Sequence, residues 1–419
     1  MSIKSAKAKE KISLTFALLL SAFIITLITL QYYDAFIYAT KIARERYTTN
    51  PISLFLIVPL AFLLSAYLCK YFAPYSAGSG TNHILSALSK LDKDSSANIG
   101  QYIGIKTIII TIISSLISCI GGGALGSEGP IVQISASIIL FIVLFLKRCF
   151  PDIDLRKWII AGSASGFAIV FNAPFAAILF AIEELTQCRS KNRFALLDWK
   201  VPLMVFISIF VRRYLTNSDA ILSFPLANIE LSHRLIFSCL LVAFLSGTSA
   251  YVMKIITDKF AKMREAASKA RWFIFPLLFG LLVASVSFVV GSSSFGSGMD
   301  DIEASMSTSN TILHLEGFFG RFINIIGSLS AGCAGGILLP SLTLGAYIGS
   351  AVSDFMNLED TRILISIGMS AFLGAIIRAP FTTAILILEI TNQTWLVFPL
   401  LICSLLSSKI YELLRKIYL

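Results

Sequence analysis

Uncharged, apolar stretches long enough to cross a lipid bilayer recur along the chain, since a transmembrane helix needs about 20 mainly apolar residues. The predicted spans are 12–33, 47–69, 107–127, 158–182, 235–253 and 390–408. The stretch 322–353 is too long for one helix and is interrupted at 335–340 by two glycines and a proline, so we expect two segments that meet at a break. Shorter pieces such as 201–211 are expected not to cross. The pattern predicts about a dozen or more helical segments of unequal length.

The composition places the chain in the membrane class. Of its 419 residues, 56% are hydrophobic and only 14% are charged, whereas about a quarter of the residues of a soluble domain are charged. We therefore predict an all-α membrane protein and exclude a soluble enzyme. A hydrolase acting within the membrane is not expected either, because the chain has no GxSxG or HExxH motif. Seven scattered cysteines without a CxxC pair and three isolated histidines predict no metal site and no cofactor.

Basic residues gather at a few points outside the apolar stretches. The clusters lie at 4–11, 189–200, 259–271 and 409–416. Cytoplasmic loops of membrane proteins are enriched in Lys and Arg, so we predict that both termini and the two internal clusters face the cytoplasm. This accounts for the net charge of +10 without a nucleic-acid partner. The predicted organisation is a cytoplasmic N-terminal segment, 1–11, followed by a single multi-pass domain, 12–419, in the cell (inner) membrane.

Three short motifs occur twice, in the same order and at nearly constant displacements of 218, 210 and 206 residues. The pairs are Gly78-Ser79-Gly80 with Gly296-Ser297-Gly298, Gly126-Ser127-Glu128-Gly129-Pro130 with Gly336-Ile337-Leu338-Leu339-Pro340, and Asn172-Ala173-Pro174 with Arg378-Ala379-Pro380. Glu183 and Glu389 each follow the proline of the third motif by nine residues. This order predicts an internal duplication, with repeats over about 50–200 and 235–405.

Membrane proteins built from repeats with Gly/Pro-interrupted segments are typically transporters whose site lies between the repeats. A helix N-terminus presents free N–H groups and a partial positive charge, so several that converge can hold an anion. Glycine lets the backbone approach the ion, and partial charges allow it to leave again. The alternative is that these motifs are ordinary kinks and close helix contacts. The ordered duplication favours an anion site.

Three glutamates are candidates for proton chemistry. Glu128 lies between uncharged spans, where a carboxylate is costly and therefore a functional candidate. At a helix start its anionic head can take the place of an anion, and protonation would release that place; the alternative is a surface glutamate that caps the helix. Glu183 and Glu184 end an apolar stretch just before a basic cluster, where one of them can pass protons inward. The alternative for this pair is two simple interfacial charges.

Together, Gly78-Ser79-Gly80, Gly126-Ser127-Glu128-Gly129-Pro130, Phe171-Asn172-Ala173-Pro174 with Ile182-Glu183-Glu184, and Gly335-Gly336-Ile337-Leu338-Leu339-Pro340 resemble the CLC family of chloride channels and proton/chloride exchangers. The resemblance covers nearly the whole chain and is to prokaryotic-type members without a regulatory domain. It implies a CLC-like inverted-repeat helical bundle with broken helices of unequal length. It also implies a homodimer in the lipid bilayer with one anion pathway per subunit.

The resemblance assigns roles to individual positions of this chain. The expected anion-binding residues are Ser79, Gly80, Gly126, Gly129, Gly336, Ile337, Leu338 and Tyr418. Glu128 matches the gating glutamate that exchanges protons with the outside, and Glu184 matches the internal proton-transfer glutamate. Tyr411 is the alternative to Tyr418 for the central tyrosine.

Some positions depart from the family pattern, and they bear on the expected function. Ser127 stands where many members have a basic residue, which removes a positive charge near the outer mouth, and Leu338 replaces a common phenylalanine. Ser79 is the residue expected of members that carry chloride. The sequence therefore predicts proton-coupled chloride antiport with chloride and protons as substrates. The alternative is a passive, voltage- or pH-gated chloride channel of the same fold.

Overall fold

The computed structural model describes residues 3–94, 97–150, 153–186, 198–216, 232–307, 310–358 and 360–418, with no side chains described for 3–12 and 418. The first half contains helices α1 (Ile3–Thr49), α2 (Leu54–Phe72), α3 (Thr81–Lys93), α4 (Ile105–Ile120), α5 (Glu128–Leu146), α6 (Leu155–Phe171), α7 (Pro174–Phe180) and α8 (Lys200–Thr216). The second half contains α9 (His233–Ala266), α10 (Lys269–Trp272), α11 (Ile274–Val290), α12 (Met299–Ser307), α13 (Thr311–Ala331), α14 (Leu338–Phe355), α15 (Thr361–Ile377), α16 (Pro380–Thr391) and α17 (Val397–Tyr418).

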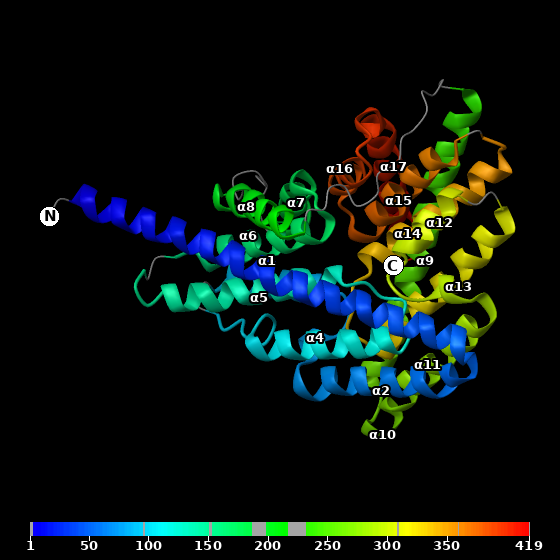
Figure 1. Ribbon diagram of the computed structural model, residues 1–419, viewed down its shortest axis with the longest axis horizontal. Coiled ribbons are helices and arrows are strands. Elements are labelled where there is room, and N and C mark those ends of the chain that lie inside the picture. The colour runs from blue at the N-terminus through cyan, green and yellow to red at the C-terminus, as the bar shows by residue number, and fades with distance from the viewer. Residues whose placement is uncertain are drawn as a thin grey trace.

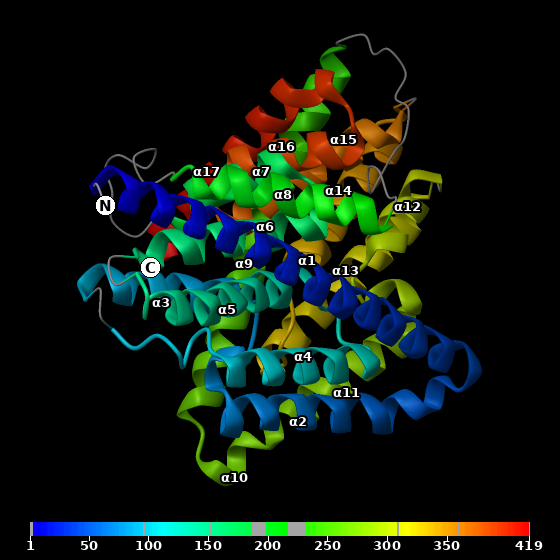
Figure 2. The ribbon, with the colours of Figure 1, turned by 60° about the vertical axis from the view of Figure 1, so that its left-hand side comes forward.

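The chain folds as a multi-pass helical membrane protein. Within its described residues, six helical stretches are long and apolar enough to cross a bilayer, and they belong to α1, α2, α5, α9, the α10–α11 stretch and α17. Shorter apolar helices, α4, α15 and α16, complete the bundle. The long helix α1 passes across the molecule, with α2, α4 and α11 together at one side and α15 to α17 at another (Figures 1 and 2). The expectation of helices of very unequal length is confirmed.

Several predicted spans coincide with observed helices, but their predicted first or last residues are wrong. The break expected within 322–353 is present at 332–337, between α13 and α14. The predicted single span 158–182 is instead two helices, α6 and α7, and the span 390–408 straddles the end of α16 and the start of α17. The stretch 201–211 belongs to the 17-residue helix α8, longer than expected. Helix α1 starts at Ile3 and runs through the predicted boundary at 11–12.

The same local rule ends a helix at equivalent points of the two repeats. Asn172 directly follows the end of α6 and Arg378 the end of α15, and both residues have a left-handed backbone, with φ of 49° and 54°. An alanine and a proline follow in each case, and a residue before proline disfavours the helical conformation. The proline then becomes the first residue of the next helix, α7 or α16, where its missing N–H has no intrahelical partner to lose. The hydropathy of the sequence alone does not predict this helix break.

Equivalent pairs of helices form the innermost layer of each repeat. Helices α5 and α6 pack against each other in the first repeat, and α14 and α15 do so in the second. A Cβ on Gly345 would lie 2.1 Å from the carbonyl oxygen of Gly368, and one on Gly349 would lie 2.0 Å from that of Leu364. Only glycine permits backbones this close, as is typical of helix contacts in membranes. These helices are buried along nearly their whole length.

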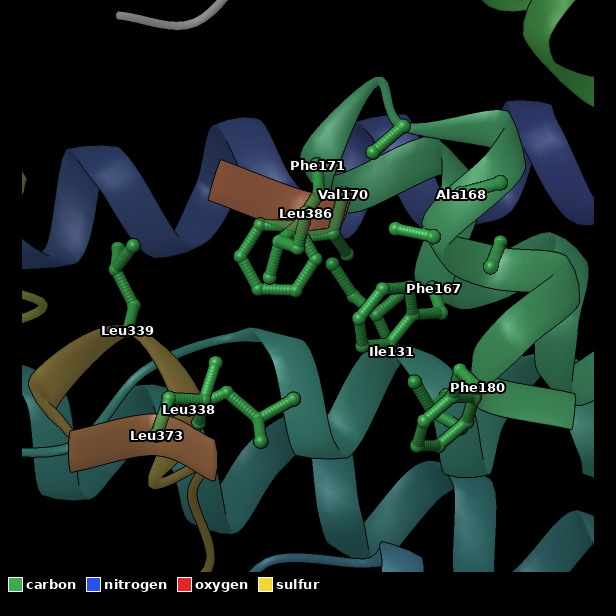
Figure 3. Packing of buried hydrophobic residues seen from close by; sticks show 14 of the residues in the cluster. Ile131, Phe167, Ala168, Val170, Phe171, Phe180, Leu338, Leu339, Leu373 and Leu386 are labelled. Atoms are coloured by element: carbon green, nitrogen blue, oxygen red, sulfur yellow. The ribbon is translucent and has the colours of Figure 1, made fainter. Parts of the chain in front are cut away.

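Apolar side chains pack around the starts of α5 and α14, where the repeats meet. Ile131 of α5, Phe167 of α6 and Leu338 of α14 belong to one buried cluster (Figure 3). The ring of Phe167 stacks on that of Phe180 at the end of α7, with centroids 4.5 Å apart. This packing fixes the helix starts in position.

Candidate functional site

The broken ends of the two repeats are joined by backbone hydrogen bonds. Gly126 and Gly336 form an antiparallel bridge, in which each N–H donates to the other's carbonyl oxygen at 2.8 and 2.6 Å. Gly78 forms a parallel bridge with Ala334, in which it donates to the carbonyl of Cys333 at 3.0 Å and accepts from the N–H of Gly335 at 3.1 Å. The structure therefore brings the first and second motifs of one repeat against the second motif of the other.

Several of the predicted glycines are required by close approach of backbones. A Cβ on Gly129 would lie 2.2 Å from the carbonyl oxygen of Ser79, and one on Gly80 would lie 2.7 Å from that of Gly129. A Cβ on Gly336 would lie 2.7 Å from the amide nitrogen of Gly129. Gly80 also has a φ of 68°, which favours glycine. The backbone segments at Gly80, Gly129 and Gly336 thus converge at a point where no side chain larger than that of glycine fits.

Two helices start side by side at this point with free backbone donors. Helix α5 begins at Glu128 and α14 at Leu338, and neither of the preceding residues, Ser127 and Ile337, caps its helix through a side chain. The first N–H groups of a helix have no intrahelical partner and carry a partial positive charge. The arrangement is suited to binding a small anion without a cationic side chain.

The Glu128 carboxylate lies inside this cradle. Its side chain is fully buried, and a Cβ on Gly126 or Gly336 would meet its Oε2 at 2.1 or 2.7 Å. The backbone N–H groups of Glu128 itself, Leu339 and Ser127 lie near it, but neither carboxylate oxygen has a hydrogen bond of standard geometry. A buried carboxyl group without such partners is costly when ionised. The position therefore suits a group that exchanges a proton and can be displaced.

A cavity of about 650 Å³ leads to the cradle from one side. Ser79, Ile337 and Leu338, all predicted anion-site residues, line it, and so does Glu184. Glu184 is 9% exposed and lies in a π-helical segment, Ala181–Leu185, that continues α7. Such π segments often occur at functional sites. The structure therefore places the predicted internal proton group and the predicted anion site on one cavity.

Glu183, the neighbour of Glu184, has a different role. Its carboxylate accepts hydrogen bonds from the N–H groups of Phe381 and Thr382, at 3.2 and 2.6 Å, and from the Thr382 hydroxyl at 2.6 Å. It thereby caps α16. Its counterpart in the second repeat, Glu389, accepts from the N–H groups of residues 175 and 176, at 3.0 and 2.8 Å, and caps α7. The two repeats hold each other's short helices through duplicated glutamates.

The structure argues against one of the two tyrosines considered for the central position. Tyr411 is buried in α17 against Tyr251, with ring centroids 5.8 Å apart, and it does not line the cavity. The side chain of Tyr418 lies outside the described residues. A tyrosine at the anion site therefore stays a prediction at Tyr418.

Sequence reasoning missed that Arg264 and Lys70, two of the three basic residues on its lining, face the cavity. Arg264 was expected in a cytoplasmic loop, but α9 extends to Ala266 and places it beside the cavity. Its Nη1 donates to the carbonyls of Leu329 and Ser330 at 3.1 and 2.8 Å, at the end of α13. Lys70 lies with its Nζ 4.1 Å from the centre of the Trp272 ring. Glu184, Asp258 and Glu265 line the same cavity, so basic and acidic side chains face each other there.

Sequence reasoning also missed Gln133. The feature that could have identified it is a polar side chain within an otherwise apolar helix. It lies one turn after Glu128 on α5, and its amide Nε2 donates to the carbonyls of Tyr75 and Tyr102 at 2.6 and 3.1 Å. Its side chain also packs against the position of Gly80. Gln133 thus positions the loop that carries Ser79.

His83 lies on α3, which is outside the apolar spanning helices, and also lines the cavity. Its ring Nε2 donates to the Ala77 carbonyl oxygen at 2.7 Å. Burial lowers the pKa of His83, against the opposing effect of that hydrogen bond. The imidazole is therefore neutral near pH 7 and supports the loop as a donor.

Comparison with known proteins agrees with this architecture. The family described as voltage gated chloride channel matches residues 61–412. A protein of Vibrio campbellii named H(+)/Cl(-) exchange transporter ClcA is 31% identical over 371 residues, which cover 85% of this chain and 75% of the relative. A protein of the same name from Klebsiella pneumoniae is 28% identical over 376 residues, covering 84% of this chain and 75% of the relative.

Solved structures show the same fold. A slow cyanobacterial Cl-/H+ antiporter superposes with a TM-score of 0.80 at 22% identity, covering 95% of this chain and 94% of the other. A CLC-type fluoride/proton antiporter superposes with a TM-score of 0.76 at 18% identity, covering 96% and 98%. With the family match over most of its length, the chain belongs to the CLC family of voltage-gated chloride channels.

Proposed function

We propose that this protein is a proton-coupled chloride antiporter, a transporter and not an enzyme. The observation that carries the proposal is the unpaired, fully buried Glu128 carboxylate in the cradle between the starts of α5 and α14. Relatives named H(+)/Cl(-) exchange transporters, 28–31% identical, support the same substrates. The proposal includes a homodimer in the inner membrane with both termini in the cytoplasm.

In the proposed cycle, chloride enters through the cavity and is held beside Ser79 by the backbone N–H groups at Ile337 and Leu338. The ionised Glu128 carboxylate competes for the outer part of the cradle, because both are anions attracted to the same helix starts. Protonation neutralises Glu128 and frees that place for chloride. Glu184, on the same cavity, supplies or accepts the proton on the inner side. The proton and the anion therefore move in opposite directions, because the ionised Glu128 carboxylate and chloride cannot occupy the same part of the cradle at once.

The test is a recording of chloride and proton movement together in proteoliposomes. A chloride gradient is expected to drive protons uphill in the parent protein. Glu128→Gln is expected to abolish proton movement and leave chloride flux, because the amide cannot exchange a proton. Retained coupling in that variant would remove Glu128 from the cycle. Chloride flux without any uphill proton movement in the parent would favour the passive channel.

Two further variants separate the anion site from the proton path. Ser79→Ala is expected to weaken chloride binding, since a hydroxyl donor is lost from a residue that lines the cavity. Glu184→Gln is expected to slow proton transport while chloride flux continues. Chloride uptake that is indifferent to both Ser79→Ala and Glu128→Gln would point to a transporter of another ion.

A further inference from the structure

In each repeat, an arginine holds the end of the helix that precedes the cradle. Arg264, in the last turn of α9, donates from Nη1 to the carbonyls of Leu329 and Ser330 at 3.1 and 2.8 Å, at the end of α13. Arg46, in the last turn of α1, donates from Nη1 to the carbonyl of Ile120 at 2.9 Å, at the end of α4. The last carbonyls of a helix have no intrahelical partner and carry a partial negative charge, so a guanidinium is suited to both places.

The two arginines occupy equivalent positions of the repeats. They are displaced by 218 residues, as the first motif is, and their targets Ile120 and Ser330 are displaced by 210 residues, as the second motif is. The turns that follow are also equivalent, because Gly122 and Gly332 are both left-handed, with φ of 91° and 90°. A long-range contact that recurs at the displacements of the motifs belongs to the duplicated architecture.

The turn that follows α13 connects the two sides of the proposed anion site. The carbonyl of Cys333 accepts the N–H of Gly78 at 3.0 Å, and the N–H of Gly335 donates to the Gly78 carbonyl at 3.1 Å. Ser79 follows Gly78 directly, and Ile337 follows Gly335 by two residues. A shift of the α13 end would therefore move both of the loops that bring these two residues to the cavity.

The guanidinium of Arg264 packs closely on this turn. A Cβ on Gly332 would lie 2.7 Å from its Nη1 and 2.9 Å from its Cζ, so only glycine leaves room for the planar group. Lys70 lines the same cavity, but its ammonium lies over the rings of Tyr71 and Trp272, 5.6 and 4.1 Å from their centres. The two cations therefore share the cavity and differ in what they contact.

We propose that Arg264 is a positioning residue that sets the anion specificity of the site, because it fixes the spacing between the loop of Ser79 and the start of α14. The inference rests on the proposed function, since the anion that the site selects is the one transported. A site whose walls are held in place discriminates against a larger ion, which must push the walls apart. The two charge-assisted bonds of Arg264 at the helix end resist this movement. Without them, the site is expected to accept a larger halide more readily and to hold chloride less well.

The experiment compares chloride with iodide, a larger halide, in proteoliposomes. It measures the chloride concentration that half-saturates chloride-36 uptake and, at chloride well below saturation, the iodide concentration that halves this uptake. The ratio of the two concentrations does not depend on how much of the protein is folded. Arg264→Met is expected to change the ratio about tenfold in favour of iodide. Arg264→Lys is expected to restore part of the change, because an ammonium keeps the charge but lacks the planar fork.

Two control variants separate position from charge. Lys70→Met removes a cation from the same cavity and is expected to keep the ratio within about twofold of the parent's. Lys262→Gln, at an exposed residue of the same helix as Arg264, is expected to match the parent in both ratio and uptake. An unchanged ratio in Arg264→Met, or an equal change in Lys70→Met, would overturn the inference while leaving the proposed function intact. Absence of chloride uptake by the parent would instead contradict the proposed function.

A second measurement does not depend on transport. At the turn that follows α4, the carbonyl of Gly123 accepts the N–H of Gly296 at 3.1 Å, as Cys333 accepts that of Gly78. In purified protein, amide hydrogen exchange is therefore expected to become faster at 332–336 in Arg264→Met and at 122–126 in Arg46→Met, because each arginine holds its own turn. Exchange unchanged at the turn would contradict a positioning role. Exchange that becomes equally faster along the whole chain would also contradict it, because it indicates a general loss of stability.

Discussion

Replacing Glu183 by alanine is expected to destabilise the protein without altering proton coupling. Its carboxylate makes two short hydrogen bonds of 2.6 Å and one of 3.2 Å to the start of α16. Helix α16 has no other side-chain cap, because the preceding residue is Ala379. For a half-buried carboxylate we take about 1 kcal/mol for each short bond and about half of that for the long one. The expected loss is therefore about 2–3 kcal/mol of unfolding free energy.

The assay combines unfolding in mixed micelles, titrated with a denaturing detergent, with proton and chloride flux in proteoliposomes. Glu183→Ala is expected to unfold at lower denaturant, and Glu183→Gln to fall between it and the parent, because an amide oxygen still accepts but carries no charge. The matched control is Glu184→Gln, at the next residue. It is expected to slow proton flux and to leave the unfolding free energy within about 1 kcal/mol of the parent.

The reasoning would be refuted by the opposite pattern. If Glu183→Ala kept the parent's stability and lost proton coupling, the carboxylate would be part of the proton path and the capping contacts would be incidental. If Glu184→Gln lost as much stability as Glu183→Ala, the two neighbours would act as one structural unit. The two readouts separate these outcomes, because neither depends on the other.

Three other changes test the loops around the site. Gly129→Ala is expected to reduce chloride flux about tenfold or more, because its Cβ would lie 2.2 Å from the Ser79 carbonyl oxygen and must displace that loop; flux equal to the parent's would show that the loop yields freely. Arg321→Met is expected to lower the unfolding free energy by about 3–5 kcal/mol, because a buried ion pair loses one partner; denaturant titration measures it. His83→Gln is expected to match the parent's chloride flux at about pH 7.5, since a lowered pKa keeps the imidazole neutral there, and to differ only at acidic pH, where the ring gains its proton.

Motif order predicted the convergence of the site better than hydropathy predicted the helices. The pairing of Gly126 with Gly336 follows what the duplicated motifs indicated. The cavity shared by Ser79 and Glu184 agrees with the positions that the family resemblance assigned. Hydropathy read 158–182 as one span because the residues on both sides of the Asn-Ala-Pro break are equally apolar. The break depends on backbone conformation at Asn172, which an apolarity window does not measure.

The residues that sequence reasoning missed act over long separations. The sequence marked Glu183 as the duplicate of Glu389 but did not show that its carboxylate contacts a helix start about 200 residues later. Arg264 looked like one more basic residue of a loop, because the polar end of α9 continues past the apolar stretch. Arg212 lies beside an identical residue, and only the packing of α8 shows that one of the two is enclosed. Such roles are fixed by tertiary contacts and not by local pattern.

The duplication repeats the helix starts that form the cradle, but it does not repeat the carboxylate that lies between them. At the displacement of 210 residues, Glu128 at the start of α5 corresponds to Leu338 at the start of α14, so the paired helix starts hold one carboxylate and not two. In the second repeat, Arg321 of α13 binds the loop that is equivalent to the one carrying Ser79. Its guanidinium donates to the carbonyls of residues 293, 295 and 296 and to the carboxylate of Asp301. A fully symmetric arrangement would place two carboxylates in one cradle, and their mutual repulsion would keep at least one protonated. Loss of symmetry at these few positions therefore leaves one carboxylate at the paired helix starts, and the proposed cycle requires this because a single proton there is to exclude or admit a single anion.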